Sequence, residues 1–259
     1  MEPLGMLIDF TECIGCGECV TACQQANDLP SNPDPEHLSD RNYTVVLKAE
    51  EQYYRQLCMH CLDPTCASVC PVGAFTKTEQ GPVLYDADKC MGCRYCMMAC
   101  PFGVPRYEWN KAIPVIKKCI FCAHRLEEGK QTACSWVCPM GATRTGTRAH
   151  LLEIAKSRVE RNPEKYVDYV YGETDAGGTS VMLLSGVPFE KLGYRMDLRK
   201  SPMPELTWQV LSKIPSIVLT GGVLLGGLSW IVNRRIRIES GELTEDHLTG
   251  ENVKEAVDE

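Results

Sequence analysis

Short stretches of alternating hydrophobic and polar residues predict a chain with several small strands. The segment GAFTKTEQGPVLYDADKC turns at Gln80–Gly81–Pro82, which predicts a hairpin with strands near Ala74–Thr78 and Val83–Tyr85. YTVVLKAE and GGTSVMLLSGVP predict two further strands, and the Pro/Asn/Asp-rich stretch NDLPSNPDPEHLSDRN predicts a surface loop. Apolar residues recur at helical spacing in RAHLLEIAKSRVERN, which predicts a helix that ends before Pro163.

One segment differs from the rest, because nineteen residues from Ile214 to Val232 pass without a charge. A helix of that length is about 28 Å long, close to the thickness of a bilayer's hydrocarbon core. A fully buried core helix would show the same pattern, but four glycines favour a membrane, where small residues allow helices to pack closely. The arginines that follow, Arg234, Arg235 and Arg237, favour a cytoplasmic C-terminus and a periplasmic cysteine domain.

The formal net charge of −7 comes from the end of the chain. From Glu239 to Glu259 there are eight acidic residues and one lysine, which is typical of a disordered, solvated tail. The preceding residues have no basic excess able to follow a phosphate backbone, which argues against nucleic-acid binding. The start MEPLGMLIDF lacks the regions of a signal peptide, so we expect a cytoplasmic chain or one exported with a signal-bearing partner.

The sixteen cysteines form four quartets that repeat one another. Three quartets end on C-x₃-C-P-x-G, in CASVCPVGA, CMMACPFGV and CSWVCPMGA, whereas the first has Gln24 in place of the proline. A short repeated unit indicates duplication of one supersecondary module. In chain order the quartets are Cys13, Cys16, Cys19, Cys23; Cys58, Cys61, Cys66, Cys70; Cys90, Cys93, Cys96, Cys100; and Cys119, Cys122, Cys134, Cys138.

Disulfides, zinc and iron–sulfur clusters all use closely spaced cysteines. Cysteines two or three residues apart pair poorly as disulfides, and zinc sites usually use C-x₂-C pairs that are well separated in the chain. The run C-x₂-C-x₂-C-x₃-C-P is that of bacterial ferredoxins, in which the fourth cysteine serves the other cluster. The third quartet matches this run fully, the first lacks only the proline, and the second and fourth have longer middles.

The spacing therefore predicts four 4Fe–4S clusters whose fourth cysteines are exchanged between quartets. A cluster with four thiolate ligands has no open site for a substrate, so we expect one-electron transfer without catalysis in this chain. Two competing hypotheses are a zinc-stapled binding module without redox activity and a freely diffusing polyferredoxin. The first would be colourless, and the second would be extracted without detergent.

The quartets, the long gap in the fourth and the apolar C-terminal segment resemble the iron–sulfur (beta) subunits of membrane-bound molybdopterin oxidoreductases and nickel–iron hydrogenases. The formate dehydrogenase N and HybA types are the most similar. The resemblance rests on LGMLIDFTECIGCGECVTACQ, QLCMHCLDPTCASVCPVGA, CMGCRYCMMACPFGVPRY, KKCIFCAHRLEEGKQTACSWVCPMGA and GGTSVMLLSGVPFEKL. It implies an inner-membrane subunit that relays electrons between a molybdopterin or nickel–iron catalytic subunit and a cytochrome b or NrfD-like membrane subunit that reacts with quinone.

The resemblance also implies which quartets exchange their last cysteine: the first with the fourth, and the second with the third. The four implied ligand sets are Cys13, Cys16, Cys19 and Cys138; Cys119, Cys122, Cys134 and Cys23; Cys58, Cys61, Cys66 and Cys100; and Cys90, Cys93, Cys96 and Cys70. Because every position is a cysteine, we expect all four clusters of the family.

These observations predict an α+β fold of duplicated bacterial-ferredoxin-like modules with long loops, followed by one C-terminal transmembrane helix. The expected boundaries are residues 1–200 for the double ferredoxin-like domain, 201–213 for a linker and 214–232 for the transmembrane helix. Residues 233–259 are expected to form a basic segment that stops membrane insertion, followed by an acidic disordered tail.

A few other side chains lie close to the cysteines in the sequence. His60 lies inside a complete quartet, so we expect packing or hydrogen bonding instead of metal ligation. We expect Trp136 to shield a cluster from water. Lys117, Lys118 and Arg125 are expected to form a solvated face or a partner contact, the alternative being a small upward shift of a cluster potential.

Overall fold

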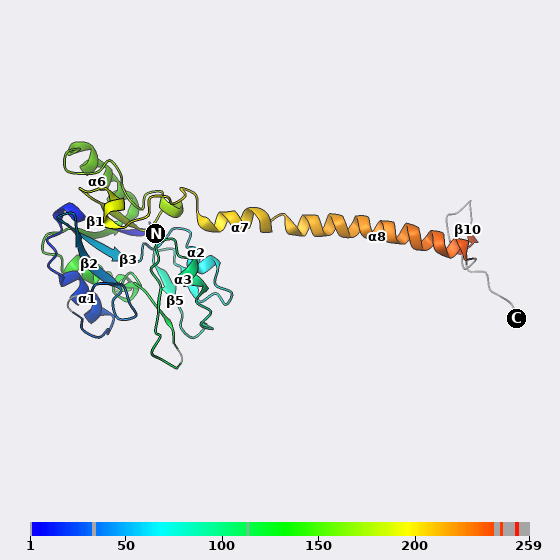
Figure 1. Ribbon diagram of the computed structural model, residues 1–259, viewed down its shortest axis with the longest axis horizontal. Helices are drawn as coiled ribbons and strands as arrows, with labels where there is room; N and C mark the ends of the chain where they lie inside the picture. The colour runs from blue at the N-terminus through cyan, green and yellow to red at the C-terminus, as the bar shows by residue number, and fades with distance from the viewer. Residues whose placement is uncertain (1, 33–34, 113, 241–243, 246–251, 254–259) are drawn as a thin grey trace. The chain divides into compact units, whose positions relative to one another are not determined.

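The computed structural model describes residues 2–32, 35–112, 114–240, 244–245 and 252–253 (Figure 1). The chain divides into two compact units, Met1–Glu205 and Leu206–Glu259. All sixteen cysteines lie in the first unit.

A three-stranded sheet forms the centre of the first unit. Strand β1 (Leu4–Asp9) lies in the middle, with β8 (Thr143–Thr147) antiparallel on one side and β9 (Val181–Leu184) parallel on the other. Helix α6 (Arg148–Arg161) packs against this sheet, as Figure 1 shows. Because successive side chains of a strand point to opposite faces, Leu7 packs with α6 while Met6 packs on the far side.

The far side of the sheet is covered by an aromatic core. Phe10, Tyr171, Phe189 and Tyr194 contact one another through tilted and edge-on rings, with centroids 5.0–6.4 Å apart. Tyr54 reaches the same cluster from a two-stranded hairpin, β2 (Thr44–Ala49) and β3 (Gln52–Leu57). The hairpin is thereby fixed to the sheet next to the first cysteine quartet.

The cysteine quartets lie in loops and on short helices around this core. Helix α1 packs against α5, and α2 packs against α3, so the first quartet meets the fourth and the second meets the third. The bounds of these helices and of the remaining elements of the unit are α1 Glu18–Ala26, α2 Thr65–Ser68, α3 Tyr95–Ala99, α4 Ala123–Glu127, α5 Ala133–Trp136, β4 Phe75–Lys77, β5 Val83–Tyr85, β6 Arg106–Tyr107, β7 Ile116–Lys117, and the 3₁₀ turns Phe10–Glu12, Asp175–Gly177 and Phe189–Leu192.

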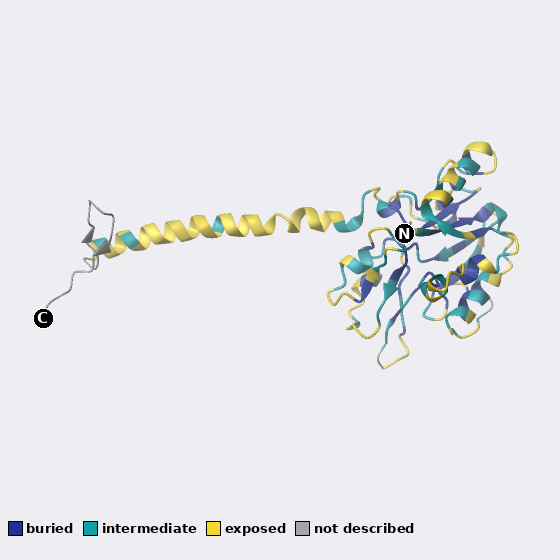
Figure 2. Ribbon diagram, turned by 180° about the vertical axis from the view of Figure 1, so that it is seen from behind, coloured by how far each residue is buried: buried dark blue, intermediate teal, exposed yellow. Residues whose placement is uncertain are grey.

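Helix α8 (Ile214–Glu239) forms most of the second unit, and α7 (Met203–Leu211) precedes it. Figure 2 shows that the residues of this helical segment are almost all exposed. From Met203 to Glu239 the segment is long and apolar enough to cross a membrane. It is the one such helix in the described part of the chain.

Several elements expected from the sequence are confirmed. The hairpin forms as β4 and β5, the stretch YTVVLKAE contains β2, the stretch GGTSVMLLSGVP contains β9, and the helix before Pro163 is α6. Helix α7 occupies most of the expected linker 201–213, and its proline, Pro204, lies in the first turn, where proline is tolerated. Most of the expected acidic tail lies outside the described residues. Its described part forms the short strands β10 (Thr244–Glu245) and β11 (Asn252–Val253).

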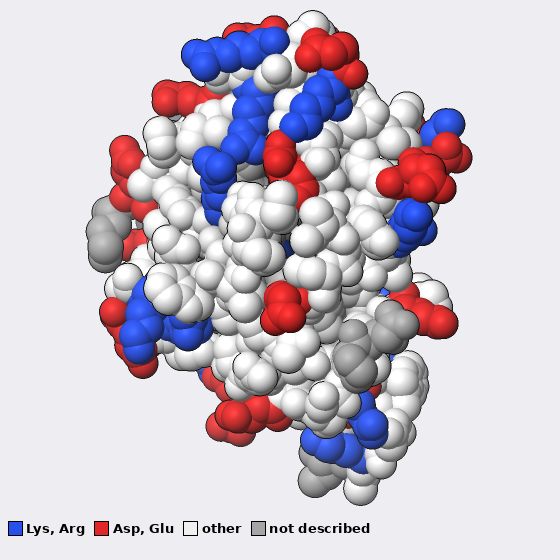
Figure 3. Space-filling model, turned by 90° about the vertical axis from the view of Figure 1, so that its left-hand side faces the viewer, with Lys and Arg blue, Asp and Glu red and all other residues white. Residues whose placement is uncertain are grey.

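Charged side chains of both signs are intermixed on the face of the molecule shown in Figure 3, with broad uncharged areas between them. Most ion pairs on the surface are local, such as Lys48–Glu51 at 3.3 Å and Lys130–Glu128 at 2.6 Å. Exposed pairs of this kind contribute little to stability.

Candidate metal centres

The structure brings the cysteines together in groups that combine two quartets, and all sixteen are free thiols. A cavity is lined by three cysteines of the first quartet and the last of the fourth: Cys13, Cys16, Cys19 and Cys138. The last cysteine of the first quartet lies elsewhere. The thiol of Cys23 interacts electrostatically with Cys134 and Cys122, and that of Cys119 interacts with Cys23 and Cys122.

The second and third quartets are combined in the same way. The thiol of Cys61 interacts electrostatically with those of Cys58, Cys100 and Cys66. That of Cys96 interacts with those of Cys90, Cys93 and Cys70. The four groups coincide with the ligand sets implied by the resemblance, and their binding of clusters stays a prediction.

The first C-x₂-C loop of each quartet turns through a left-handed residue immediately before its second cysteine. The residues are Gly15, His60, Gly92 and Phe121, with φ between +49° and +74°. At Gly15 a Cβ atom would lie only 2.4 Å from the ring of Tyr53, so this position accepts glycine alone. The shared turn bends the loop around the space between its cysteines.

This turn directs backbone N–H groups at the first thiol of the loop. The N–H of Gly92 donates to Sγ of Cys90 over 3.4 Å, and that of Phe121 donates to Sγ of Cys119 over 3.3 Å. The N–H of Gly15 makes the equivalent bond to Cys13. Hydrogen bonds to sulfur are one of the means by which proteins set cluster potentials.

The C-P-x-G endings also share one conformation. Gly73, Gly103 and Gly141 have φ of +61°, +59° and +61°, and each N–H donates to the carbonyl of the last cysteine of its quartet. The first quartet has Gln24 instead of proline and continues into α1. The side chain of Gln24 is buried and hydrogen-bonds Asn42 and the backbone of Asn32. Gln24, the residue that replaces the proline of the repeat, therefore anchors the predicted surface loop NDLPSNPDPEHLSDRN.

Burial makes the thiolate form of these cysteines costly without a positive counterpart. Burial, with the neighbouring Cys134, raises the pKa of Cys23 to about 12. Burial, with the neighbouring Cys58, raises the pKa of Cys66 to about 12. Bound metal ions reverse this effect, because ligating thiols are deprotonated.

The donor set fits iron–sulfur clusters better than zinc. In the described part of the chain, no three Cys, His, Asp or Glu side chains are grouped closely enough to hold a single metal ion. Zinc ligands must all lie within about 2.3 Å of one ion, whereas the four thiols of a 4Fe–4S site surround a larger inorganic core. Sixteen thiols in four groups of four match that requirement.

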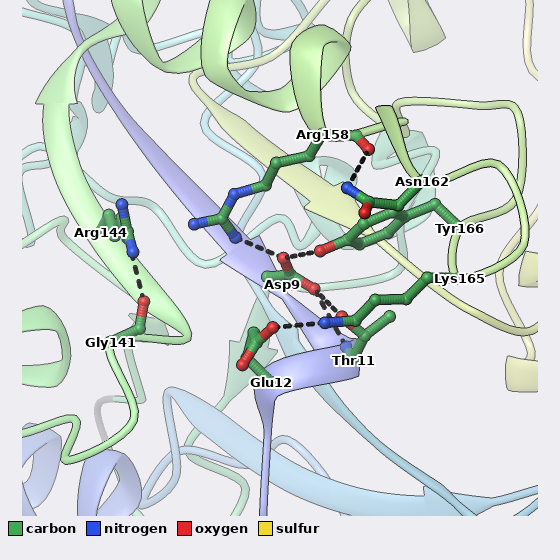
Figure 4. A network of polar contacts seen from close by, with 9 residues as sticks. All are labelled: Asp9, Thr11, Glu12, Gly141, Arg144, Arg158, Asn162, Lys165 and Tyr166. Carbon is green, nitrogen blue, oxygen red and sulfur yellow. Dashed lines mark hydrogen bonds and ion pairs between the residues drawn. The ribbon is translucent and has the colours of Figure 1, made fainter. Parts of the chain in front are cut away.

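A buried polar network fixes the start of the first quartet (Figure 4). Asp9, 1% exposed, ends β1 and accepts hydrogen bonds from the hydroxyl of Tyr166 at 2.9 Å and from Thr11, and it forms an ion pair with Arg158. Lys165 pairs with Glu12 at 2.5 Å, one residue before Cys13. These contacts tie the entrance of the quartet to α6 and to the segment after it.

Two expectations about side chains near the cysteines are wrong. Lys118 is 4% exposed, and its ammonium donates to the carbonyl of Cys119 at 3.0 Å, so it does not belong to a solvated face. The backbone alternation of β7 turns it inwards, while Lys117 stays half-buried. Trp136 is 74% exposed and lies on the surface instead of sealing a cysteine group. His60 is buried and packs edge-on against Phe121, as expected.

Comparison with known proteins matches two sequence profiles to this chain. The profile described as "4Fe-4S dicluster domain" matches residues 49–148, and the one described as "4Fe-4S binding domain" matches residues 6–26. The "Hydrogenase-2 operon protein HybA" of Escherichia coli O157:H7 is 36% identical over 292 residues, which cover 94% of this chain and 88% of the relative. The chain belongs to the HybA family of iron–sulfur subunits.

Other relatives extend this family. The iron–sulfur subunit of the nitrate-inducible formate dehydrogenase of Escherichia coli K12 is 35% identical over 195 residues, covering 68% of this subunit and 66% of the relative. A protein of Nitratidesulfovibrio vulgaris is 40% identical over 273 residues, covering 99% and 72%. This iron–sulfur subunit therefore has ferredoxin-type 4Fe–4S domains, the character of an electron-transfer subunit and an apolar helix suited to membrane anchoring.

Proposed function

We propose that this subunit holds four 4Fe–4S clusters and relays electrons without catalysing a reaction on a metabolite. The proposed ligand sets are the four groups of cysteines described above, one set for each cluster. When bound, a 4Fe–4S cluster with four thiolate ligands accepts and returns one electron and has no open coordination site. The observation that carries the proposal is the grouping of all sixteen thiols into four sets of four across the quartets.

Contacts between the sets support a linear order. Cys19 of the first set interacts electrostatically with Cys134 of the second. Cys119 of the second set interacts with Cys58 of the third, and both pack around the same small core. Cys66 of the third set interacts with Cys96 of the fourth. Each set thus lies near the next, as a relay of short steps requires.

The two ends of this line reach the surface. Cys16 in the first set and Cys93 in the fourth are the two exposed cysteines of the sixteen. Exposed apolar side chains flank both: Ile14 and Met140 line the cavity of Cys16, and Met91 and Tyr95 lie two residues from Cys93 in the sequence. Exposed aromatic and methionine side chains are enriched at protein interfaces, so both ends suit partner subunits.

The names of the relatives indicate the class of partner. We infer a catalytic subunit of the nickel–iron hydrogenase or molybdopterin type at one end, and a cytochrome b or NrfD-like membrane subunit that reacts with quinone at the other. The packing of α1 on α5 and of α2 on α3 supports two duplicated ferredoxin-like modules within residues 1–200. The apolar helix supports a single-pass anchor in the inner membrane. Because arginines follow this helix, we propose that the C-terminus is cytoplasmic and the clusters are periplasmic.

Anaerobic purification of the full chain with its co-purifying partners tests the proposal. We expect a brown protein with broad visible absorbance that dithionite bleaches. After subtraction of the partners' own metal, the subunit should contain about sixteen irons, four for each cluster. A colourless subunit that contains zinc would overturn the proposal, and so would iron for fewer than three clusters.

A further inference from the structure

A buried arginine lies between the first two sets of cysteines. Arg55 is on β3 and is 2% exposed. It lines the same cavity as the thiols of Cys13, Cys16, Cys19 and Cys138. Its guanidinium also interacts electrostatically with the thiol of Cys134, which belongs to the second set. One fixed positive charge therefore lies near two proposed cluster sites.

Two threonines hold the guanidinium in place. Its Nε–H donates to Oγ1 of Thr44 over 2.8 Å, and Nη1 donates to Oγ1 of Thr143 over 3.0 Å. Thr44 begins β2 and Thr143 begins β8, so three strands, β2, β3 and β8, fix the position of the charge. Hydroxyls satisfy the hydrogen bonds but supply no negative charge.

Arg55 has no carboxylate within ion-pair distance among the residues that the structure describes. A buried charge without a counter-charge is strongly destabilising, and arginine does not escape by losing its proton. The groups that favour its charged form are thiols: Cys134 and Cys19 foremost, then Cys23. The missing counter-charge must therefore come from these thiolates and from what they bind.

We propose that Arg55 is the shared counter-cation of the first two clusters and raises the reduction potentials of both. The inference rests on the proposed function. Dithionite reduces a cluster by one electron, which adds one negative charge next to the guanidinium. The attraction favours the reduced state, and no proton moves because arginine stays protonated. The thiols that favour the charged guanidinium most, Cys134, Cys19 and Cys23, all belong to the first two sets, so we expect the third and fourth clusters to respond less.

The test is a redox titration of the anaerobically purified complex, followed by electron paramagnetic resonance. The variants are Arg55→Gln, which removes the charge, and Arg55→Lys, which keeps it. Arg148→Gln is the matched control, because Arg148 is half-buried and its guanidinium donates to backbone carbonyls of Thr179 and Glu173 instead of lying next to cysteines. Iron content is measured on every sample.

We expect Arg55→Gln to lower two of the four midpoint potentials and leave the other two unchanged. Arg55→Lys should retain most of the original values, and the control should retain all four. Unchanged potentials in an Arg55→Gln complex with full iron would overturn the inference, as would an equal shift in all four. A wild-type complex without four clusters would instead overturn the proposed function, so the two failures are distinguishable.

A second measurement covers the case in which Arg55→Gln does not assemble. Wild-type complex labelled with ¹⁵N-arginine is reduced and examined by pulsed electron paramagnetic resonance. We expect a ¹⁵N coupling to a reduced cluster that the Arg55→Lys complex, labelled in the same way, lacks. A coupling of the same size in both would overturn the inference, and so would no coupling in either.

Discussion

The backbone N–H of Val83, in the β4–β5 hairpin, donates over 2.9 Å to Nδ1 of His60, which lies between Cys58 and Cys61. Because Nδ1 accepts this bond, the proton of the neutral ring is on Nε2. Burial, with Lys118 and Lys77 nearby, lowers the pKa of His60 well below its usual value and keeps the ring neutral. The Nε2 atom is buried and has no hydrogen-bond partner among the described residues. We predict that its N–H donates to a sulfur atom of a bound cluster.

Replacing His60 should affect both stability and one cluster. His60→Leu leaves the buried N–H of Val83 unpaired, and we expect a loss of about 1–3 kcal/mol in the free energy of unfolding. Loss of the Nε2–H donor should also lower the midpoint potential of the cluster at Cys58 and Cys61. Thermal unfolding and a redox titration measure the two effects. His37→Leu, at an exposed position, should change neither.

Paired substitutions test the exchange of cysteines between quartets. Cys13 and Cys138 lie in one group, whereas Cys13 and Cys23 lie in two. Cys13→Ser combined with Cys138→Ser should therefore remove one cluster, about four irons. Cys13→Ser combined with Cys23→Ser should remove two. Iron and acid-labile sulfide are measured in the anaerobic complex. The opposite order of losses would show that each quartet holds its own cluster.

The ion pair between Asp9 and Arg158 should be important for the stability of the first unit. Arg158→Leu leaves a buried carboxylate without its cation, and such losses typically cost about 3 kcal/mol. Arg161→Leu, on the exposed face of the same helix, is the control and should cost little. Chemical denaturation of the anaerobic protein measures both. Equal effects of the two substitutions would contradict a special role for Asp9.

The apolar helix α8 should hold the chain in the membrane. Leu224 lies near the middle of the segment Ile214–Val232, where a lysine disfavours insertion by about 3 kcal/mol. Leu224→Lys combined with Leu225→Lys should shift the chain from the membrane to the soluble fraction, with its clusters retained. Leu224→Ala combined with Leu225→Ala is the control and should stay with the membrane. Retention of the double lysine variant would mean that partners, not α8, anchor the chain.

Local sequence accounts for the parts of this protein that repeat. The quartets, the β4–β5 hairpin, α6 and the apolar segment are all visible in spacing and periodicity, because each depends on residues close together in the chain. Strand β1 was not predicted, since LGMLID is apolar on both faces and lies between α6 and the aromatic core. Its partner β9 is more than 170 residues away, a distance over which periodicity carries no information.

The sequence by itself determined that the chain has sixteen cysteines in ferredoxin-like loops, because ligand spacing within a loop is a local property. Only the tertiary structure decided what lies between those loops. Arg55 looks like an ordinary charged residue in a strand, and Lys118 looks like part of a basic surface. Both are buried because strands from distant parts of the chain close over them. Burial is a property of the whole fold, and it is burial that gives each of these charges its influence on the cysteines.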